Sequence, residues 1–376
     1  MTTIRVSSED EVVDAVGAAR AARRTLEIVG RGSKRGLGRA VESDDMLDCS
    51  ALSGIVSYEP EELVLTCKAN TPVAEIVEAV TRANQQLGFA PADWGPLYGA
   101  AAGTATIAGV LSADACGSAA VRYGRARDHL LGYRAVNGLG EAYRGGGKVV
   151  KNVTGFDLPK LMCGAFGTLG VLTEVTLRVF PRAGSSAVLR VRNLEAASGL
   201  ALLRRVWSSP LEATGLGYVP GDGASVRLDG ATRPLAEKIA ALRVLLPECA
   251  IEDGDPKAFD RIGNGAMFVD SELPVWRIAV PPANAAQSIE VLRPVHWCAD
   301  WAGGLLWIAT DVEPARVHAA ASKADGRAVL MRADEVARHG PVFPPEGEVR
   351  LKITRSVKAA FDPLHLFNPG RMAEGI

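Results

Sequence analysis

The sequence predicts an α+β protein of two domains, and three observations support this fold class. The chain has 376 residues, 48% of them hydrophobic, which is enough for more than one core. Its glycines cluster within the first 180 residues, at 30–38, 95–117 and 138–147. The composition changes near 181–186, and beyond it segments of strand and helix periodicity alternate. The expected parts are a first domain over 1–183, a second domain over 187–345, and a C-terminal helix and tail over 346–376.

In the first domain, local signals predict two helices, a hairpin and several short strands. A capping box at Ser8–Glu11 precedes apolar residues at helical spacing and predicts the first helix. A second helix is expected at Thr71-Pro72, because proline is favoured at the first helical position. Asn137-Gly138 between two apolar runs indicates a β-hairpin. Strands are expected at 25–29, 46–49, 55–58, 63–69 and 171–180.

In the second domain, strand and helix patterns alternate without a glycine-rich phosphate loop. Strands are expected at 187–192, 225–228, 276–280 and 305–310, and helices at 195–206, 232–246, 283–292 and 314–323. This order favours a sheet with helices on one face, and no repeat of fixed period is visible. The aromatic segment His296–Gly304 either lines a pocket or forms a strand and turn in a core, which is the more common case. From Glu346 a helical pattern leads to FDPLHLFNPGRM, whose prolines end it.

Charge and hydropathy exclude several classes of protein. The formal net charge of −1 gives no global field to attract nucleic acid or an anionic membrane. The uncharged stretch Trp94–Ala113 contains too few strongly apolar residues for a transmembrane segment. The N-terminus lacks a secretory signal, so we expect a cytoplasmic protein. The six cysteines form no CxxC pair, so reduced thiols and no metal site are expected.

The first segment that could carry chemistry is the loop Gly30–Gly38, which follows a predicted strand. It offers backbone amides, the hydroxyl of Ser33 and three cationic side chains, as a pyrophosphate site requires. No helix opens after the loop and no GxxxxGK[ST] pattern is present, so it is neither a Rossmann nor a Walker loop. A phosphate cradle and a surface turn therefore both remain open.

The second such segment, Ala102–Gly109, is rich in small residues and continues to Gly117-Ser118 and Arg122–Gly124. Small residues let the backbone approach a flat or extended ligand, although they also suit close helix packing. A third segment of this kind lies at Gly164–Thr173. Three segments in one chain favour a single large cofactor.

The order of these motifs resembles the flavoproteins of the vanillyl-alcohol oxidase and p-cresol methylhydroxylase family. The motifs are GRGSK, GTATIAG…CGSAAVRYGRARD, NVTGFDLPKLMCGAFGTLGVLTE and FDPLHLFNPGR. The stretch 151–182 is most similar to the FAD-binding subunits of bacterial glycolate oxidases. The resemblance covers 1–183 and the C-terminal tail. It implies an FAD-binding domain of two α+β subdomains with a ferredoxin-like α+β cap domain.

The resemblance also implies which residues would bind FAD. The first loop would hold the diphosphate through Arg31, Gly32, Ser33 and Lys34. The second loop would act through Gly103, Thr104, Thr106 and Gly109, with Ala113, Asp114, Gly117 and Ser118 beside the flavin. The remaining positions are Arg122, Tyr123 and Gly124 of a tyrosine–glycine element, Gly170 and Val171 at the ring system, and Asn368 and Arg371 of the tail. Backbone amides suit the diphosphate, and an apolar slot suits the neutral ring.

We expect FAD to be bound without a covalent tether. No histidine lies in either loop, and Cys116 occupies a position typical of small packed residues. Related D-2-hydroxy acid dehydrogenases use clustered histidines, whereas the five histidines here form no HxH or HxxxH pair. No catalytic base is assigned.

Two functions of different classes follow from the resemblance. The chain is either the FAD-binding subunit of a complex that oxidises a small 2-hydroxy acid, glycolate or D-lactate, or a non-catalytic FAD-binding structural or electron-relay subunit. An oxidase that acts alone with oxygen is less favoured. The implied partners are a second flavin-binding subunit and an iron–sulfur subunit, since this chain has no iron–sulfur ligand motif. The complex would be cytoplasmic, at the inner face of the membrane. We expect 187–345 to carry much of the interface, because it keeps Trp207, Trp276, Trp297, Trp301 and Trp307.

Overall fold

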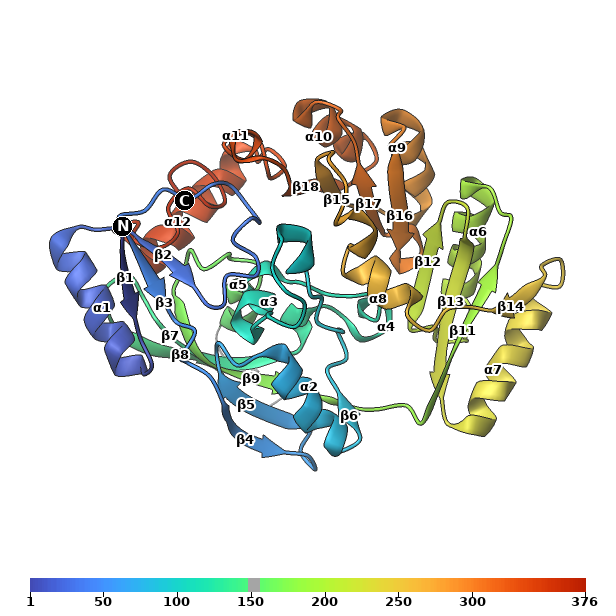
Figure 1. Ribbon diagram of the computed structural model, residues 1–376, viewed down its shortest axis with the longest axis horizontal. Coiled ribbons are helices and arrows are strands. Elements are labelled where there is room, and N and C mark those ends of the chain that lie inside the picture. Colours follow the sequence, from blue (N-terminus) through green and yellow to red (C-terminus); the bar gives the residue numbers. More distant parts are fainter. Residues whose placement is uncertain (148–155) are drawn as a thin grey trace. The chain divides into compact units, whose positions relative to one another are not determined.

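The computed structural model describes residues 1–147 and 156–376 and divides the chain into two compact units (Figure 1). Unit 1 contains 1–115, 125–181 and 338–376, and unit 2 contains 116–124 and 182–337. The division at 181/182 lies close to the domain boundary expected from composition. The segment 116–124, which was expected in the FAD domain, groups with unit 2 instead. The KNVTG part of the long motif, at 151–155, lies outside the described residues.

Unit 1 begins with a parallel sheet of three strands. Its order is β1 (Thr2–Arg5), β3 (Asp45–Asp48) and β2 (Leu26–Val29). Helix α1 (Glu9–Ala22) begins as predicted, because the Ser8 side chain accepts a hydrogen bond from the amide of Glu11. Val12 and Val16 of α1 share one hydrophobic core with Phe367 of the C-terminal tail. The tail is therefore part of this subdomain.

The second subdomain of unit 1 is built on an antiparallel sheet of five strands. The order is β4 (Ile55–Glu59), β5 (Val64–Lys68), β9 (Val171–Arg178), β7 (Leu130–Val136) and β8 (Ala142–Gly146). Strands β7 and β8 form the predicted hairpin at Asn137-Gly138. The other elements of unit 1 are α2 (Val73–Arg82), β6 (Gln85–Gln86), η1 (Pro96–Tyr98), α3 (Ile107–Ala113), η2 (Ala126–Asp128), α5 (Leu158–Met162), β10 (Phe180–Pro181), α11 (Glu335–Arg338, whose last residue is in unit 1) and α12 (Glu348–Phe361).

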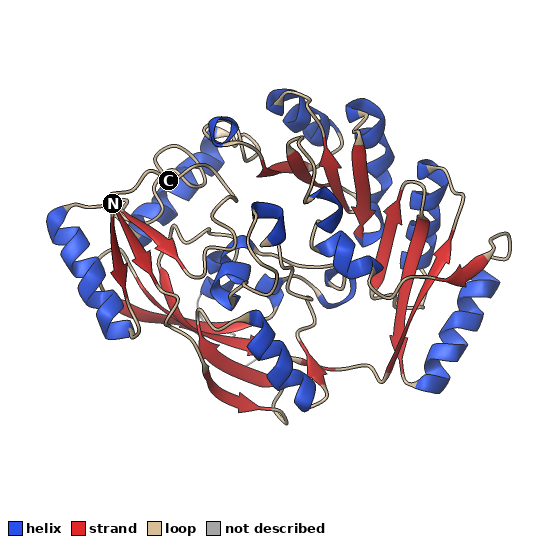
Figure 2. Cartoon of the chain, viewed as in Figure 1, coloured by secondary structure: helices blue, strands red, loops and turns tan. Residues whose placement is uncertain are grey.

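Unit 2 contains an eight-stranded antiparallel sheet made of two similar halves (Figure 2). The first half runs β11 (Ser185–Val191), α6 (Ala196–Trp207), β12 (Gly215–Val219), β13 (Gly223–Gly230), α7 (Thr232–Leu245) and β14 (Ile251–Asp253). The second half repeats this β-α-β-β-α-β order with β15 (Val275–Ala279), α9 (Ala285–Leu292), β16 (His296–Asp300), β17 (Leu305–Ala309), α10 (Pro314–Lys323) and β18 (Arg327–Arg332). The strand orders β14-β11-β13-β12 and β16-β17-β15-β18 are mirror-related and meet at the pairing of β12 with β16. The expected ferredoxin-like cap is therefore confirmed, and it is a tandem pair of such units.

Helices cover both faces of this sheet, whereas one covered face was expected. Tyr218 on β12 contacts α6, since a Cβ at Gly199 would overlap its ring. The neighbouring Gly217 faces the other way, where a Cβ would lie 2.7 Å from Ile262 of α8 (Ala258–Gly263). Successive side chains of a strand point to opposite faces. Helix α8 therefore packs on the face opposite α6, and the short helices α4 (Ala120–Tyr123), η3 (Ala266–Phe268), η4 (Pro282–Asn284) and η5 (Trp301–Gly303) complete the unit.

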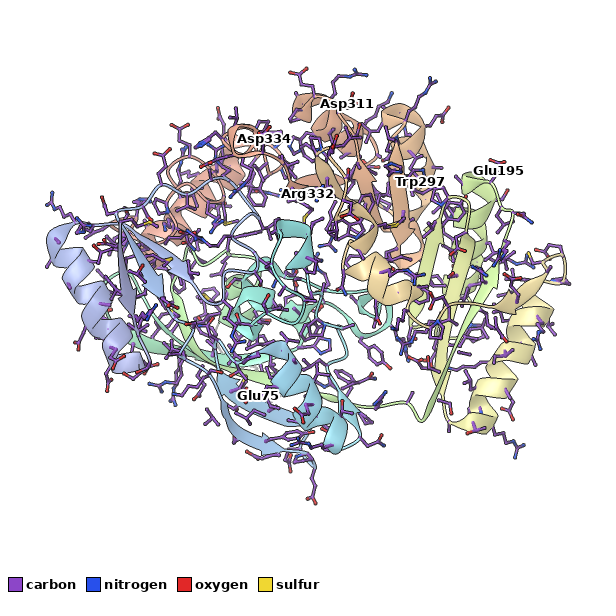
Figure 3. The ribbon with its side chains drawn as sticks, in the orientation of Figure 1. Glu75, Glu195, Trp297, Asp311, Arg332 and Asp334 are labelled. Atoms are coloured by element: carbon purple, nitrogen blue, oxygen red, sulfur yellow. The ribbon has the colours of Figure 1, made fainter. Side chains whose placement is uncertain are left out.

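The tryptophans expected at an interface differ in exposure. Trp276 and Trp307 are buried in the core of unit 2, whereas Trp207 on α6 is 53% exposed. Trp297, labelled on β16 in Figure 3, is half-buried. Its ring stacks on that of Tyr218, with ring centroids 5.3 Å apart. Of these tryptophans, only those that lie outside the core could contribute to an interface.

No helix in the described part of the chain combines the length and the apolar character needed to cross a membrane. Trp94–Ala113 instead forms η1, a connecting loop and α3, with Trp94 buried. All six cysteines have free thiols.

Candidate functional site

Unit 1 contains a cleft at the end of β2, with about 800 Å³ of space not filled by atoms, part of it open to solvent. The first loop, the start of α3, the segment 166–172 and the C-terminal tail all line it. The predicted site residues among its lining are Arg31, Gly32, Ser33, Lys34, Thr106, Gly109, Ala113, Gly170, Asn368 and Arg371. The two loops that were expected to hold one cofactor therefore meet at one cleft.

The first loop presents a row of open backbone amides. Among the described residues, the amides of Arg31, Gly32, Ser33 and Lys34 donate to no protein acceptor, whereas the next, of Arg35, donates to the Gly32 carbonyl at 3.2 Å. Gly32 has a φ of 71°, a left-handed conformation that favours glycine and turns the chain sharply. Successive free amides in such a turn form a concave site for an anion.

Lys34 adds a half-buried cation to this loop. Its Nζ lies 3.5 Å from Ser33 Oγ, and a Cβ at Gly109 would lie 3.9 Å from the same Nζ. Burial lowers the pKa of Lys34 to about 8, with the charge of Asp93 opposing part of this shift. A lysine that is desolvated in this way is stabilised in its charged form by a nearby anion.

The start of α3 differs from the first loop because its amides are already occupied. Thr106 caps the helix, its Oγ1 accepting from the amide of Gly109 at 3.3 Å. The amides of Ile107 and Ala108 donate to the carbonyls of the turn that precedes α2. The expected second row of free amides is therefore not present at 107–109. This side of the cleft offers small side chains and a close backbone surface instead.

Asn70 is a lining residue that the sequence analysis missed. Its Oδ1 accepts from Thr106 Oγ1 at 3.3 Å, and a Cβ at Gly30 would overlap the same oxygen. Asn70 therefore lies between the two loops. Its position before the Thr71-Pro72 helix start was the signal that could have pointed to it.

The remaining lining residues that were not predicted are mainly apolar or small. Cys49 is one of them, and burial raises the pKa of its thiol to about 12, so it remains protonated. The full set is Ile28, Val29, Gly30, Arg35, Leu37, Cys49, Asn70, Ala108, Ser112, Phe166, Gly167 and Leu172.

The C-terminal tail closes the cleft through Asn368 and Arg371. Asn368 Oδ1 accepts from the amide of Ile28 at 2.9 Å, and its Nδ2 donates to the Phe166 carbonyl at 2.8 Å. A Cβ at Gly167 would lie 2.7 Å from that Nδ2. The side chain of Asn368 thus fixes two walls of the cleft relative to each other.

The other predicted site residues do not line this cleft. In unit 1, the Gly103 amide donates to Asp93 Oδ2 at 2.7 Å, and Asp114 pairs with Arg125 at 2.6 Å. The predicted residues of unit 1 outside the lining are Gly103, Thr104, Asp114 and Val171. Those that belong to unit 2 are Gly117, Ser118, Arg122, Tyr123 and Gly124.

Unit 2 buries a carboxyl group that the sequence analysis passed over. Asp300, at the end of β16, is fully buried, and its Oδ2 accepts from Ser118 Oγ at 2.6 Å. Its Oδ1 accepts from the amide of Trp301 at 2.8 Å. Burial raises the pKa of Asp300 to about 6, although both hydrogen bonds and the charge of Arg277 oppose the shift. Asp300 anchors the segment 116–124 to the sheet of unit 2. It lies in the aromatic segment 296–304, which forms the strand and turn favoured from sequence.

The histidines are dispersed and do not contribute to the cleft. His129 packs between Phe89 and Phe180, with ring centroids 5.0 and 5.2 Å away. His318 packs against Trp276 at 5.3 Å. The other three, His296, His339 and His365, are exposed. In the described part of the chain, no group of three or more His, Cys, Asp or Glu side chains could hold a metal ion.

Comparison with known proteins supports an FAD-linked family. The family described as "FAD binding domain" matches residues 2–146. The chain is 32% identical to glycolate oxidase subunit GlcE of Escherichia coli K12 over 348 residues, which cover 92% of each protein. It is 30% identical to a D-lactate dehydrogenase of Archaeoglobus fulgidus over 45% of this chain and 36% of that one.

Solved structures show the same fold. A p-cresol methylhydroxylase matches 99% of this chain and 88% of its own with a TM-score of 0.70, at 13% identity. An alkyldihydroxyacetonephosphate synthase matches 98% of this chain and 75% of its own with a TM-score of 0.71, at 14% identity. These identities support the fold alone.

Proposed function

Because the chain belongs to the FAD-linked family of glycolate oxidase subunit GlcE, we propose that it is the FAD-binding subunit of a 2-hydroxy acid dehydrogenase complex that oxidises glycolate to glyoxylate. The observation that carries the proposal is the row of open amides at 31–34 beside the half-buried Lys34, in one cleft with the start of α3. A dianionic diphosphate matches both features.

The cleft residues fit FAD in charge and in shape. The amides of the first loop and Lys34 would bind the diphosphate. The small residues Gly109 and Ala113 of α3, with Leu172 among the other lining residues, would leave an apolar slot for the ring system. When bound, FAD supplies the two-electron acceptor that oxidation of an alcohol to a carbonyl requires. The residues of the chain would bind and orient the cofactor.

The FAD is proposed to be dissociable. Cys49 lines the cleft as a buried thiol whose raised pKa keeps it unreactive, and no histidine or tyrosine is among the lining residues described. Acid precipitation of the loaded protein should therefore release all flavin into the supernatant. Flavin that stays with the precipitated chain would contradict this part of the proposal.

The electrons are proposed to leave through other subunits. The cysteines of this chain have no iron–sulfur spacing, so a flavin reduced here would need an acceptor from outside. A second flavin-binding subunit and an iron–sulfur subunit are the proposed partners, with unit 2 and its exposed Trp207 at the interface. The proposed location is the cytoplasm, at the inner face of the membrane. Co-purification of the three subunits, followed by membrane fractionation, tests this arrangement.

The alternative function is an FAD-binding relay or structural subunit. The dispersed histidines favour it, because none of the five lines the cleft where a base would act on substrate. Stopped-flow mixing of the isolated, FAD-loaded chain with glycolate or D-lactate separates the two functions. Bleaching of the flavin absorbance within the turnover time of the complex supports direct oxidation. A spectrum that stays oxidised alone, but is reduced when the second flavin subunit is added, supports the relay.

A further inference from the structure

Two arginines from the C-terminal part of unit 1 bind the carbonyl oxygens of the first loop. Arg371 Nη1 donates to the carbonyls of Arg35 and Leu37 at 2.9 and 2.8 Å. Arg338, the last residue of α11, donates through Nε to the Gly38 carbonyl at 3.0 Å. Its Nη2 donates to the carbonyls of Arg35 and Arg39 at 3.1 and 3.3 Å.

The loop and the two arginine segments are also joined through their backbones. The amide of Arg39 donates to the Arg371 carbonyl at 3.0 Å, and the amide of Ala40 donates to the Arg338 carbonyl at 3.3 Å. A Cβ at Gly38 would lie 2.9 Å from Arg371 Cδ, so glycine is needed for this approach. The second half of the loop is therefore bonded through its backbone to these two segments.

This arrangement gathers more positive than negative charge. Arg371 is only 6% exposed and lies close to Arg35 and Arg338, with Glu27 at 3.6 Å as its carboxylate partner. Burial, together with the charges of Arg338 and Arg35, lowers the pKa of Arg371 to about 10, although Glu27 opposes the shift. Glu27 also pairs with Arg35, at 3.0 Å from its Nε. A single carboxylate therefore serves two cations, Arg35 and Arg371, which suits a loop that binds an anion.

The carbonyl contacts hold the part of the loop that directly follows the open amides of 31–34. A peptide unit is rigid and carries its C=O and the next residue's N–H on opposite sides, so binding the carbonyls of Arg35, Leu37, Gly38 and Arg39 restrains the loop from residue 35 onward and limits how the preceding turn can move. Without these donors, a peptide of the loop could rotate and present a carbonyl oxygen where an amide is needed. A carbonyl dipole repels a phosphate, whereas an amide attracts it.

We propose that Arg338 and Arg371 are positioning residues that fix the first loop in its anion-binding conformation by binding its carbonyl oxygens. The inference rests on the proposed FAD function, because it assigns the loop to the diphosphate. Arg338 belongs to none of the motifs recognised in the sequence and lies 300 residues from the loop that it binds. It acts through the loop and does not line the cleft.

The test compares Arg338→Met, Arg338→Lys and, as the control, Arg355→Met, which removes an exposed arginine of α12. Dissociation constants are measured for FAD and for ADP, which contains the diphosphate without the flavin, together with the melting temperature of the ligand-free chain. For Arg338→Met we expect both constants to rise by the same factor, about tenfold or more, since charge-assisted hydrogen bonds are lost. Arg338→Lys should recover part of the affinity, and Arg355→Met should match the wild type.

The outcomes separate this inference from the proposed function. Wild-type affinities in Arg338→Met would overturn the positioning role. A large fall in the melting temperature of that variant, with a proportional loss of affinity and no rescue by lysine, would show that Arg338 only stabilises the fold. This result would also overturn the positioning role. A wild-type chain that binds neither FAD nor ADP would instead refute the proposed function, and the positioning role with it.

Discussion

Lys34 should make the binding of FAD depend on pH above neutrality. Burial holds its pKa at about 8 in the ligand-free chain. A bound diphosphate would restore the pKa towards the ordinary value of about 10.4. Affinity is then complete well below pH 8, where the ligand-free lysine is fully charged, and falls as the pH rises through 8 towards the pKa of the complex. Between pH 7 and 9 the dissociation constant of FAD should rise about tenfold, or about 1.4 kcal/mol.

The assay is calorimetric titration of FAD into the ligand-free chain at pH 7, 8 and 9, in buffers of different ionisation enthalpy. At pH 8 the wild type should take up about half a proton as FAD binds, since half of Lys34 is neutral there. Lys34→Met should abolish the proton uptake, flatten the pH dependence and weaken binding at pH 7 by about 10- to 100-fold. The control Lys352→Met, on the exposed side of α12, should change none of these quantities. Unchanged proton uptake in Lys34→Met would refute the assignment of Lys34 to the diphosphate.

Three further predictions concern packing and burial. Gly30→Ala should weaken FAD binding and destabilise the chain by about 1–3 kcal/mol, because the added Cβ would overlap Asn70 Oδ1. The control in thermal melts is Gly17→Ala, where an added Cβ meets nothing within 4 Å. In the wild type, the raised pKa of Asp300 favours its protonated form, so the free energy of unfolding should fall by about 3 kcal/mol from pH 4 to 7 as the pH rises through about 6. Asp300→Asn should abolish this fall, because the amide does not ionise. Melting temperatures at pH 5 and 8 that shift equally in both proteins would contradict this. Lys358→Met should lower the free energy of unfolding by about 3–5 kcal/mol, because Lys358 and Asp362 are both fully buried and paired at 2.7 Å. A decrease below about 1 kcal/mol in denaturant titration would show that the Asp362 carboxylate does not need Lys358 as a partner.

The sequence predicted the local elements well because their signals are local. The capping box at Ser8 and the turn at Asn137-Gly138 are each contained in a few residues, and both structures form as expected. Glycine clustering likewise located the first loop, because a turn with positive φ at Gly32 leaves a direct trace in the sequence.

Features that depend on distant pairings left no such trace. The joining of the two halves of unit 2 rests on one pairing, between Tyr218 and Ala299, and neither residue signals it. The segment 116–124 follows α3 directly in the chain, yet Ser118 is held by Asp300, 182 residues away. Arg338 and Asn70 are similar cases, since each acts on the cleft region through a contact that only the folded chain creates.

The most direct test of the central claim is amide hydrogen exchange at 30–36, compared between the FAD-loaded and the FAD-free chain. If the diphosphate occupies the first loop, FAD should slow the exchange of the amides of Arg31 to Lys34, which have no protein acceptor of their own among the described residues. The amides of Ile107 and Ala108, already bonded in the free chain, should change much less. Unchanged exchange at 31–34 under saturating FAD would contradict the account.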